Sequence, residues 1–146
     1  MGCIYKHHTI SQRQFNETVK PLLAKIAKEK KTCYLTGDLN MNLLEMERNK
    51  EIESFFDKLT DANFMPLITL PTRISKTSKT LIDNIYYNQF ENDIISGNLT
   101  VGIADHLPQF AIIPGFAINK PTNHESTPKM ARKFKNIDTI EIQSRS

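Results

Sequence analysis

Two stretches of the sequence repeat apolar residues at helical spacing, and each needs a second layer of structure to cover its apolar side. The first stretch follows Ser11 and Gln14, which have capping-box spacing, and its apolar face holds Phe15, Val19, Leu22, Leu23 and Ile26. The second runs from Glu51 to about Leu59, with an apolar face made by Ile52, Phe55, Phe56 and Leu59. We therefore expect two amphipathic helices that pack on a sheet.

Short runs of β-branched and aromatic residues supply the strands of that sheet. The run 32–36 stops at Gly37, which places the polar residues after it on a loop at the end of a buried strand. Further extended runs are 68–73, 81–87, 94–95, 99–103 and 110–113, with Gly97 and Asn98 as turn residues between two of them. The mixture of helices and strands predicts an α/β or α+β fold.

Composition narrows the class of protein. The 146 residues suit one domain, and no apolar stretch approaches the roughly 20 residues of a membrane span. No secretory signal pattern is visible, which makes an intracellular location the default expectation. Cys3 and Cys33 form neither a disulfide framework nor a paired metal motif. The formal charge of +3 permits a nucleic-acid partner without requiring one.

The sequence changes character after residue 118. Polar and proline residues are followed by a basic stretch from Lys129 to Lys135 with few apolar partners. We expect a domain over residues 1–118 and a linker or basic tail over 119–146. A tail that contacts DNA phosphates and a merely solvated linker are both consistent with this composition.

Several polar residues at strand ends could carry chemistry. Asp38 and Asn40 follow a strand, although Asp and Asn are also common turn residues. Asp83 lies within an otherwise apolar strand, where a carboxylate needs a partner to offset its loss of solvation. Asp105 and His106 end another strand, and an Asp oriented toward a His can fix the imidazole tautomer. Each of these signals is weak by itself.

Four motifs in order are more specific than any one of them. They are Gly-Asp-Leu-Asn at 37–40, Pro-Thr-Arg at 71–73, Thr-Leu-Ile-Asp-Asn-Ile at 80–85 and Ala-Asp-His-Leu-Pro at 104–108. This order resembles the endonuclease/exonuclease/phosphatase superfamily, and within it the endonuclease domain of non-LTR retrotransposon reverse-transcriptase polyproteins. The resemblance runs from about Tyr5 to Ile113.

The resemblance has two departures and one absence. Ala104 stands where the family usually has Ser, and Lys-His-His at 6–8 stands where Arg-Pro-Pro usually follows the Tyr. The first half of the family domain, with its Asn and metal-binding Glu, has no counterpart before Met1. The resemblance thus implies the C-terminal half of a DNase I-like domain, a partial four-layer β-sandwich flanked by helices. We expect such a chain alone to nick DNA weakly or not at all, since its sheet edges would lack partners.

The resemblance also implies catalytic roles in phosphodiester hydrolysis. Tyr5 would donate its hydroxyl to the phosphate, and Asp38 would accept the proton of the attacking water. Asn40 would hydrogen-bond the phosphate or the nucleophile. His106 would stabilise a phosphoryl oxygen, oriented by Asp83.

The metal implied by the resemblance is Mg²⁺, and Mn²⁺ could substitute. An all-oxygen site of carboxylates, an amide and water suits Mg²⁺. Its ligands would come from Asp38, Asn40 and Asp105, with Asp105 acting directly or through an ordered water. His7 and His8 are expected to be a solvated loop pair and not a zinc site, because the two cysteines lack ligand spacing.

The implied substrate is DNA, nicked in the nucleus, with a reverse transcriptase domain downstream in a full-length polyprotein. A first alternative is a catalytically inactive remnant that keeps the motifs. A second is a phosphoesterase acting on lipid or nucleotide phosphates, because one fold can host several substrates.

Overall fold

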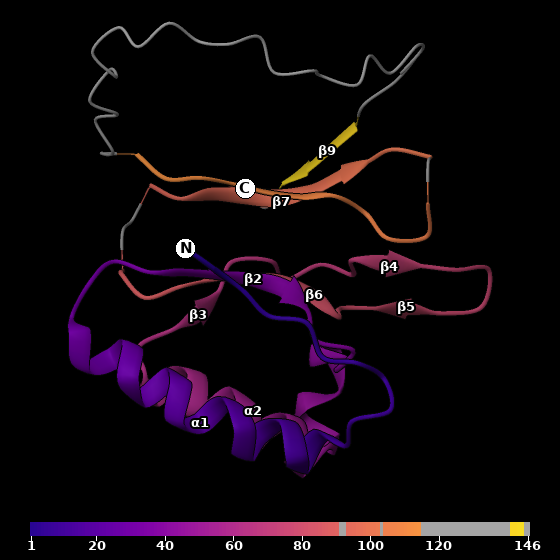
Figure 1. The fold of residues 1–146 in the computed structure, drawn as a ribbon. Helices are drawn as coiled ribbons and strands as arrows, with labels where there is room; N and C mark the ends of the chain where they lie inside the picture. Colours follow the sequence, from indigo (N-terminus) through magenta and orange to yellow (C-terminus); the bar gives the residue numbers. More distant parts are fainter. Residues whose placement is uncertain (91–92, 103, 115–140, 145–146) are drawn as a thin grey trace, which may run out of the picture.

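The computed structural model describes residues 1–90, 93–102, 104–114 and 141–144. Within these residues helices and strands are mixed, which confirms the predicted α+β class (Figure 1). The helices are α1 (Gln12–Glu29) and α2 (Lys50–Asp61), with the 3₁₀ helix η1 (Leu43–Arg48) just before α2. In the described part of the chain no helix has both the length and the apolar character to cross a bilayer.

The main sheet has four strands in the order β1-β2-β6-β3. Its members are β1 (Gly2–Cys3), β2 (Tyr34–Asp38), β6 (Asp83–Tyr87) and β3 (Met65–Pro66). The β1 strand runs parallel to β2, whereas β6 is antiparallel to both of its neighbours. Both helices lie on one side of this sheet (Figure 1).

A second sheet lies on the other side of the main sheet, and a hairpin projects from its edge (Figure 1). The second sheet has the order β8-β7-β9, from β7 (Ile95–Thr100), β8 (Gln109–Ile112) and β9 (Glu141–Ser144). A hairpin of β4 (Arg73–Ile74) and β5 (Lys79–Thr80) projects beside the end of β6 (Figure 1). The tail expected from residue 119 lies outside the described residues, apart from the four residues of β9.

Both helices begin at side-chain caps, of which the capping box at Ser11 and Gln14 was predicted from the sequence. Ser11 caps α1 with a complete capping box, in which its side chain accepts from the Gln14 amide. Asn49 caps α2 by accepting from the amides of Glu51 and Ile52. The two predicted helices are thereby confirmed, with α2 extending slightly beyond the predicted range.

The hydrophobic core lies between the helices and the main sheet. Phe55 of α2 is central to it, and its ring centroid lies 5.8 Å from that of Phe15 and 6.3 Å from that of Tyr86. Leu35 and Leu39 reach the same core from β2 and the residue after it. Successive side chains of a strand point to opposite faces, so Asp38 and Asp83 lie on the face turned away from the helices.

Gly37 allows the first segment of the chain to lie close against β2. Backbone pairing continues past β1, because the Ile4 amide donates to Thr36 at 2.8 Å and the Lys6 amide donates to Asp38 at 3.0 Å. A β-carbon at position 37 would stand 1.7 Å from the Ile4 carbonyl oxygen. Any other residue would therefore force these segments apart at the end of β2.

Two strand predictions were wrong. β2 continues to Asp38, so Gly37 and Asp38 lie within the strand and not on a loop after it. Gly97 and Asn98 do not form a turn but continue β7, which runs unbroken from Ile95 to Thr100. Asn98 is fully buried, and its side-chain amide donates to the Pro71 carbonyl at 2.9 Å. This long-range contact outweighs the local turn preference of the Gly-Asn pair.

Candidate functional site

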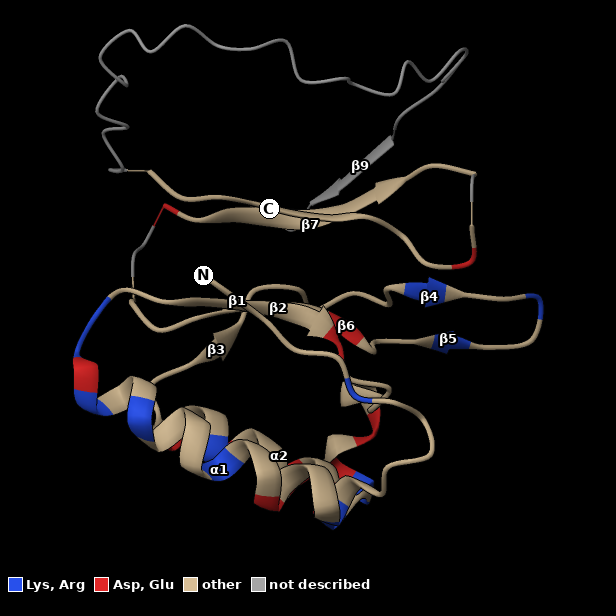
Figure 2. Cartoon of the chain, viewed as in Figure 1, with Lys and Arg blue, Asp and Glu red and all other residues tan. Residues whose placement is uncertain are grey.

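Two carboxylates face each other where β2 ends and β6 begins. Asp38 and Asp83 are register partners in this antiparallel pair, and Figure 2 shows acidic residues at these strand ends beside the basic β4–β5 hairpin. Like charges directly opposite one another destabilise a strand pair. A positive group is therefore expected near both of them.

His106 lies beside this carboxylate pair. Its Nδ1 is 3.0 Å from Asp83 Oδ2 and 3.3 Å from Oδ1. The Asp83 side chain is 13% exposed and that of His106 is 37% exposed, so the contact lies at the edge of solvent. Because a carboxylate accepts hydrogen bonds, the ring donates from Nδ1, which leaves Nε2 for another partner.

Asp38, Asp83 and His106 together have the composition of a metal site. One ligand atom from each lies within 4.8 Å of the others. Carboxylate and imidazole groups bind divalent ions such as Mg²⁺, Mn²⁺ and Zn²⁺. The structure therefore brings together three of the predicted residues from three separate motifs.

Asn40 stabilises the end of β2 through hydrogen bonds to Asp38 and Lys6. Its amide donates to Asp38 Oδ1 at 2.8 Å, and its backbone is left-handed, with φ of 46°, a conformation that Asn tolerates. Its side-chain Nδ2 donates to the Lys6 carbonyl at 2.9 Å. The side-chain nitrogen of Asn40 is thus bound to a backbone carbonyl, which leaves the side-chain oxygen Oδ1 free to contact a metal or a phosphate.

Tyr5 lies on the same face of the sheet as Asp38. The register pairs Cys3 with Thr36, so two residues further along Tyr5 accompanies Asp38. The Tyr5 side chain is 62% exposed, and its ring meets His7 edge-on at 6.3 Å. In the described part of the structure no hydrogen bond engages its hydroxyl, which leaves that group available to a ligand.

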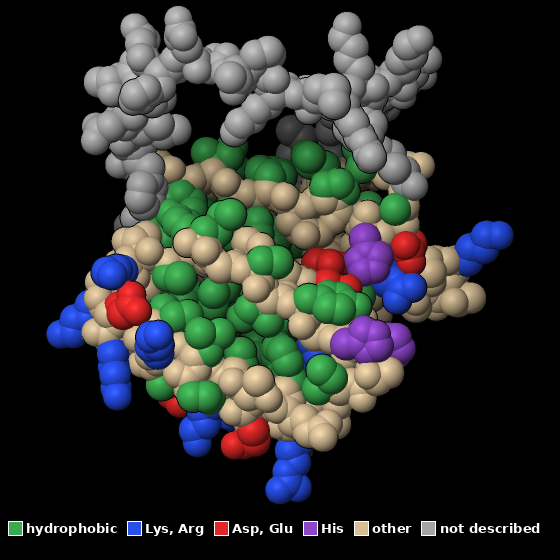
Figure 3. Space-filling view, viewed as in Figure 1, with side chains coloured by type: hydrophobic (Ala, Val, Ile, Leu, Met, Phe, Trp, Pro, Cys, Tyr) green, Lys and Arg blue, Asp and Glu red, His purple; other side chains and the backbone are tan. Residues whose placement is uncertain are grey.

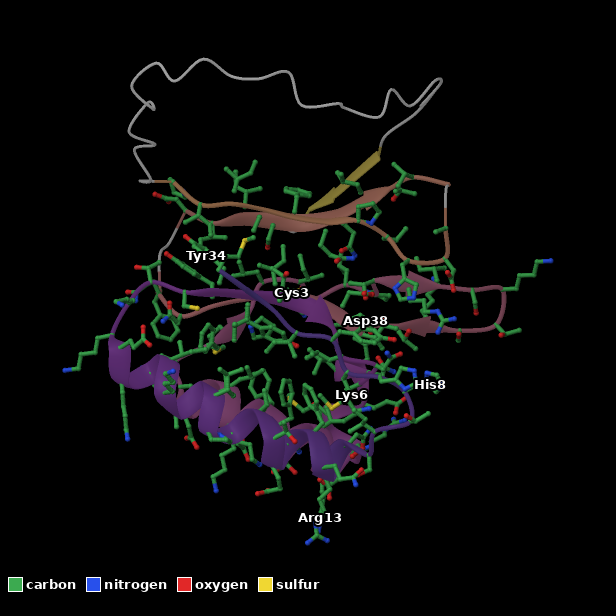
Figure 4. The ribbon with its side chains drawn as sticks, viewed as in Figure 1. Cys3, Lys6, His8, Arg13, Tyr34 and Asp38 are labelled. Atoms are coloured by element: carbon green, nitrogen blue, oxygen red, sulfur yellow. The ribbon has the colours of Figure 1, made fainter. Side chains whose placement is uncertain are left out.

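Lys6 is a buried cation whose role the sequence does not indicate. It alternates with Tyr5 and so points toward the helix side, where it is only 3% exposed. Figure 4 shows Lys6 below the sheet, near Asp38 and His8. Burial lowers the pKa of Lys6, while the negative charge of Asp38 opposes that shift.

Thr72 fixes the positions of β6, which carries Asp83, and of the segment that carries His106. Its hydroxyl oxygen accepts from the amides of Ile82 at 3.2 Å and Asp83 at 3.0 Å. Its own amide donates to Thr80, and its carbonyl accepts from Leu107 at 2.7 Å. The sequence analysis includes Thr72 in the Pro-Thr-Arg motif but does not predict this structural role.

Asp105 does not belong to the three-residue group. Its Oδ2 instead accepts from Arg73 Nε at 2.8 Å, and both side chains are about half exposed. The hydrogen bond from Arg73 lowers the pKa of the Asp105 carboxyl, and the same bond raises the pKa of Arg73. The structure thus pairs this predicted metal ligand with a cation. Sequence alone could not indicate the pairing, because the two residues are far apart in the chain.

His7 and His8 are exposed residues of the segment between β1 and α1. Their ring centroids are 4.2 Å apart, and His7 Nδ1 is 2.8 Å from the Thr9 hydroxyl oxygen. Neither residue enters a metal-ligating group of three or more in the residues that are described. Figure 3 shows histidine side chains gathered on this face beside acidic and basic ones.

Comparisons of the chain with family models, with curated proteins and with solved structures found no match.

Proposed function

We propose that this chain is part of a metal-dependent phosphodiesterase with a DNase I-like fold, and that it acts on DNA. The observation that carries the proposal is the gathering of Asp38, Asp83 and His106 within 4.8 Å from separate motifs. The carboxylates of Asp38 and Asp83 lie opposite one another and repel, and a divalent cation bound between them would offset that repulsion. The four ordered motifs of the sequence support the same reaction class.

The residues of the site have the properties that phosphodiester hydrolysis requires. A bound Mg²⁺ or Mn²⁺ would supply positive charge against the phosphoryl oxygens. Asp38 would accept the proton of the attacking water, and the Asn40 side-chain oxygen would help to position that water. Asp83 orients the ring of His106, whose Nε2 would donate a hydrogen bond to a phosphoryl oxygen. The exposed Tyr5 hydroxyl would make a further hydrogen bond to phosphate.

Basic residues beside the site support a nucleic-acid substrate. Arg73, Lys76 and Lys79 are exposed on the β4–β5 hairpin and its loop, next to the acidic strand ends (Figure 2). Lysine and arginine that neutralise phosphates supply most of the sequence-independent affinity for DNA. A nuclear location and a downstream reverse transcriptase belong to the same proposal through the retrotransposon-like motifs.

Nicking of supercoiled plasmid tests the proposal. The purified full chain is incubated with plasmid and Mg²⁺ or Mn²⁺, and Mn²⁺ binding is measured in parallel by electron paramagnetic resonance. Asp38→Ala and His106→Ala should lower any nicking rate by orders of magnitude. Glu17→Ala, which removes an exposed carboxylate of α1, should change neither nicking nor Mn²⁺ binding.

The outcomes separate the proposal from its alternatives. Absence of Mn²⁺ binding that depends on Asp38 would favour an inactive remnant. Hydrolysis of small phosphate esters with no action on plasmid would favour the other phosphoesterase. Equal nicking by the wild-type chain and both site variants would reject the assigned roles.

A further inference from the structure

Arg73 is fixed beside the candidate site by its backbone. It forms an isolated antiparallel bridge with His106, and the amide of the next residue, Ile74, donates to the Asp105 carbonyl at 2.8 Å. The preceding residue, Thr72, holds the Asp83 amide. The α-carbon of Arg73 therefore cannot move without disturbing the segments that carry Asp83 and His106.

The Arg73 guanidinium is bound through its Nε, while its two terminal nitrogens have no partner among the described residues. Its Nε donates to Asp105 Oδ2 at 2.8 Å, whereas its terminal nitrogens make no hydrogen bond or ion pair within the described residues. The side chain is 47% exposed, so these nitrogens can be reached from solvent. It also lies near enough to Asp38 and Asp83 for their charges to act on it.

This arrangement suits the recognition of a phosphate. A guanidinium is planar and permanently charged, and its donors match two oxygens of a phosphate group. An ion pair at Nε limits the rotation of the side chain, which reduces the entropy lost when a ligand binds. Arg73 and His106 are bridge partners whose side chains leave the backbone on one face, so a phosphate could lie between Arg73 and a metal held by Asp38 and Asp83.

We propose that Arg73 binds a non-bridging oxygen of the substrate phosphodiester through its terminal nitrogens, with Asp105 as the positioning residue that orients it. This inference rests on the proposed function and names a residue that touches the substrate. It gives Asp105 a task other than metal binding. It also gives the arginine of the Pro-Thr-Arg motif a chemical role.

A structural role is the competing explanation, because the Arg73–Asp105 pair also joins β4 to the segment before β8. A structural pair would stabilise the fold but would not distinguish a charged phosphate from a neutral one. Exposed ion pairs usually contribute little to stability, so the fold should tolerate substitution of Arg73. The test therefore compares ligands that differ only in the charge of one phosphate.

The probe is the dinucleoside phosphate dTpdT, with its neutral methylphosphonate analogue as the matched ligand. Binding to the full chain is followed by ¹H–¹⁵N NMR in the presence of EDTA, so that neither metal nor cleavage contributes. Arg73→Gln should weaken binding of dTpdT by about ten- to a hundredfold, as expected for a lost charge-assisted hydrogen bond. Arg73→Lys and Asp105→Asn should cause smaller losses, because each keeps the positive charge. Lys28→Ala, which removes an exposed lysine of α1 on the other side of the main sheet, should have no effect.

The neutral analogue decides between the two roles. Wild-type protein and Arg73→Gln should bind the methylphosphonate with equal affinity. The backbone spectra of the two ligand-free proteins should also agree, apart from residues next to position 73. Equal affinities of the two proteins for dTpdT would overturn the inference, as would an equal loss of affinity for both ligands. Absence of Asp38-dependent Mn²⁺ binding together with Arg73-dependent binding of dTpdT would refute the metal-dependent hydrolytic proposal alone.

Discussion

The two faces of the main sheet are built from alternating residues of the same strands, yet they serve different ends. On the helix side, Leu35 of β2 and Tyr86 of β6 pack into the apolar core. On the opposite side, Asp38 and Asp83 of those strands face each other beside His106. The difference shows how one pair of strands can build the apolar core on one face and carry the candidate site on the other. Substitutions on the helix side should change stability, and those on the other side should change ligand binding.

The largest expected effect is on the helix side. Phe55→Ala should lower the free energy of unfolding by about 3–5 kcal/mol, because it leaves a cavity among buried aromatic rings. Chemical denaturation measures this loss. Phe90→Ala, which truncates a ring that is 77% exposed, should change stability by less than about 0.5 kcal/mol. A loss of Mn²⁺ binding in the still-folded fraction of Phe55→Ala would contradict the separation of the two faces.

A smaller effect is expected where the two faces are joined by Thr72. Thr72→Val keeps the shape of the side chain but removes the acceptor of two buried amides, at a cost of about 1–3 kcal/mol. This substitution should also lower Mn²⁺ affinity, because Asp83 loses its backbone restraint. Thr18→Val, on the exposed surface of α1, is the matched control for stability. Retention of full Mn²⁺ affinity in Thr72→Val would show that Asp83 is positioned by other contacts.

Stability at high pH tests the apolar environment of Tyr86. Burial raises the pKa of Tyr86, so the folded state keeps this phenol neutral where the unfolded state ionises it. The unfolded chain then binds fewer protons above its ordinary pKa of about 10, and stability falls by about 1.4 kcal/mol per pH unit there. This contribution is fully present below that pH and is lost as the pH rises. Tyr86→Phe should remove it from the slope of stability against pH, and an unchanged slope would place the hydroxyl in contact with solvent.

The smallest effect on stability is expected at the site itself. Asp83→Asn should change the free energy of unfolding by less than about 1 kcal/mol, because it weakens the contact with His106 but relieves repulsion from Asp38. Calorimetry measures this change, and titration with Mn²⁺ should show weaker binding. A large loss of stability with unchanged Mn²⁺ affinity would mean that the carboxylate has a structural role only.

The sequence predicts the helix side of the molecule better than the contacts around the site. Apolar periodicity indicates both helices because burial of one face determines them locally. Motif order brings Asp38, Asp83 and His106 into one expectation, and the structure does gather them. The pairing of Arg73 with Asp105 depends instead on how distant segments meet, as does the extended backbone at Gly97 and Asn98. Neither the Arg73–Asp105 pair nor the extended backbone at Gly97 and Asn98 can be predicted from the residues next to it in the sequence.

The alignment of β6 with β2 has a consequence for how the site can change. Moving β6 by a single residue would set Asn84 opposite Asp38 and turn the Asp83 carboxylate into the apolar layer. Two buried contacts oppose such a slip: Asn84 exchanges hydrogen bonds with the backbone of Ile68, and Thr72 holds the Asp83 amide. An insertion or deletion within either strand would therefore abolish the carboxylate pair even if every residue of the motifs were kept.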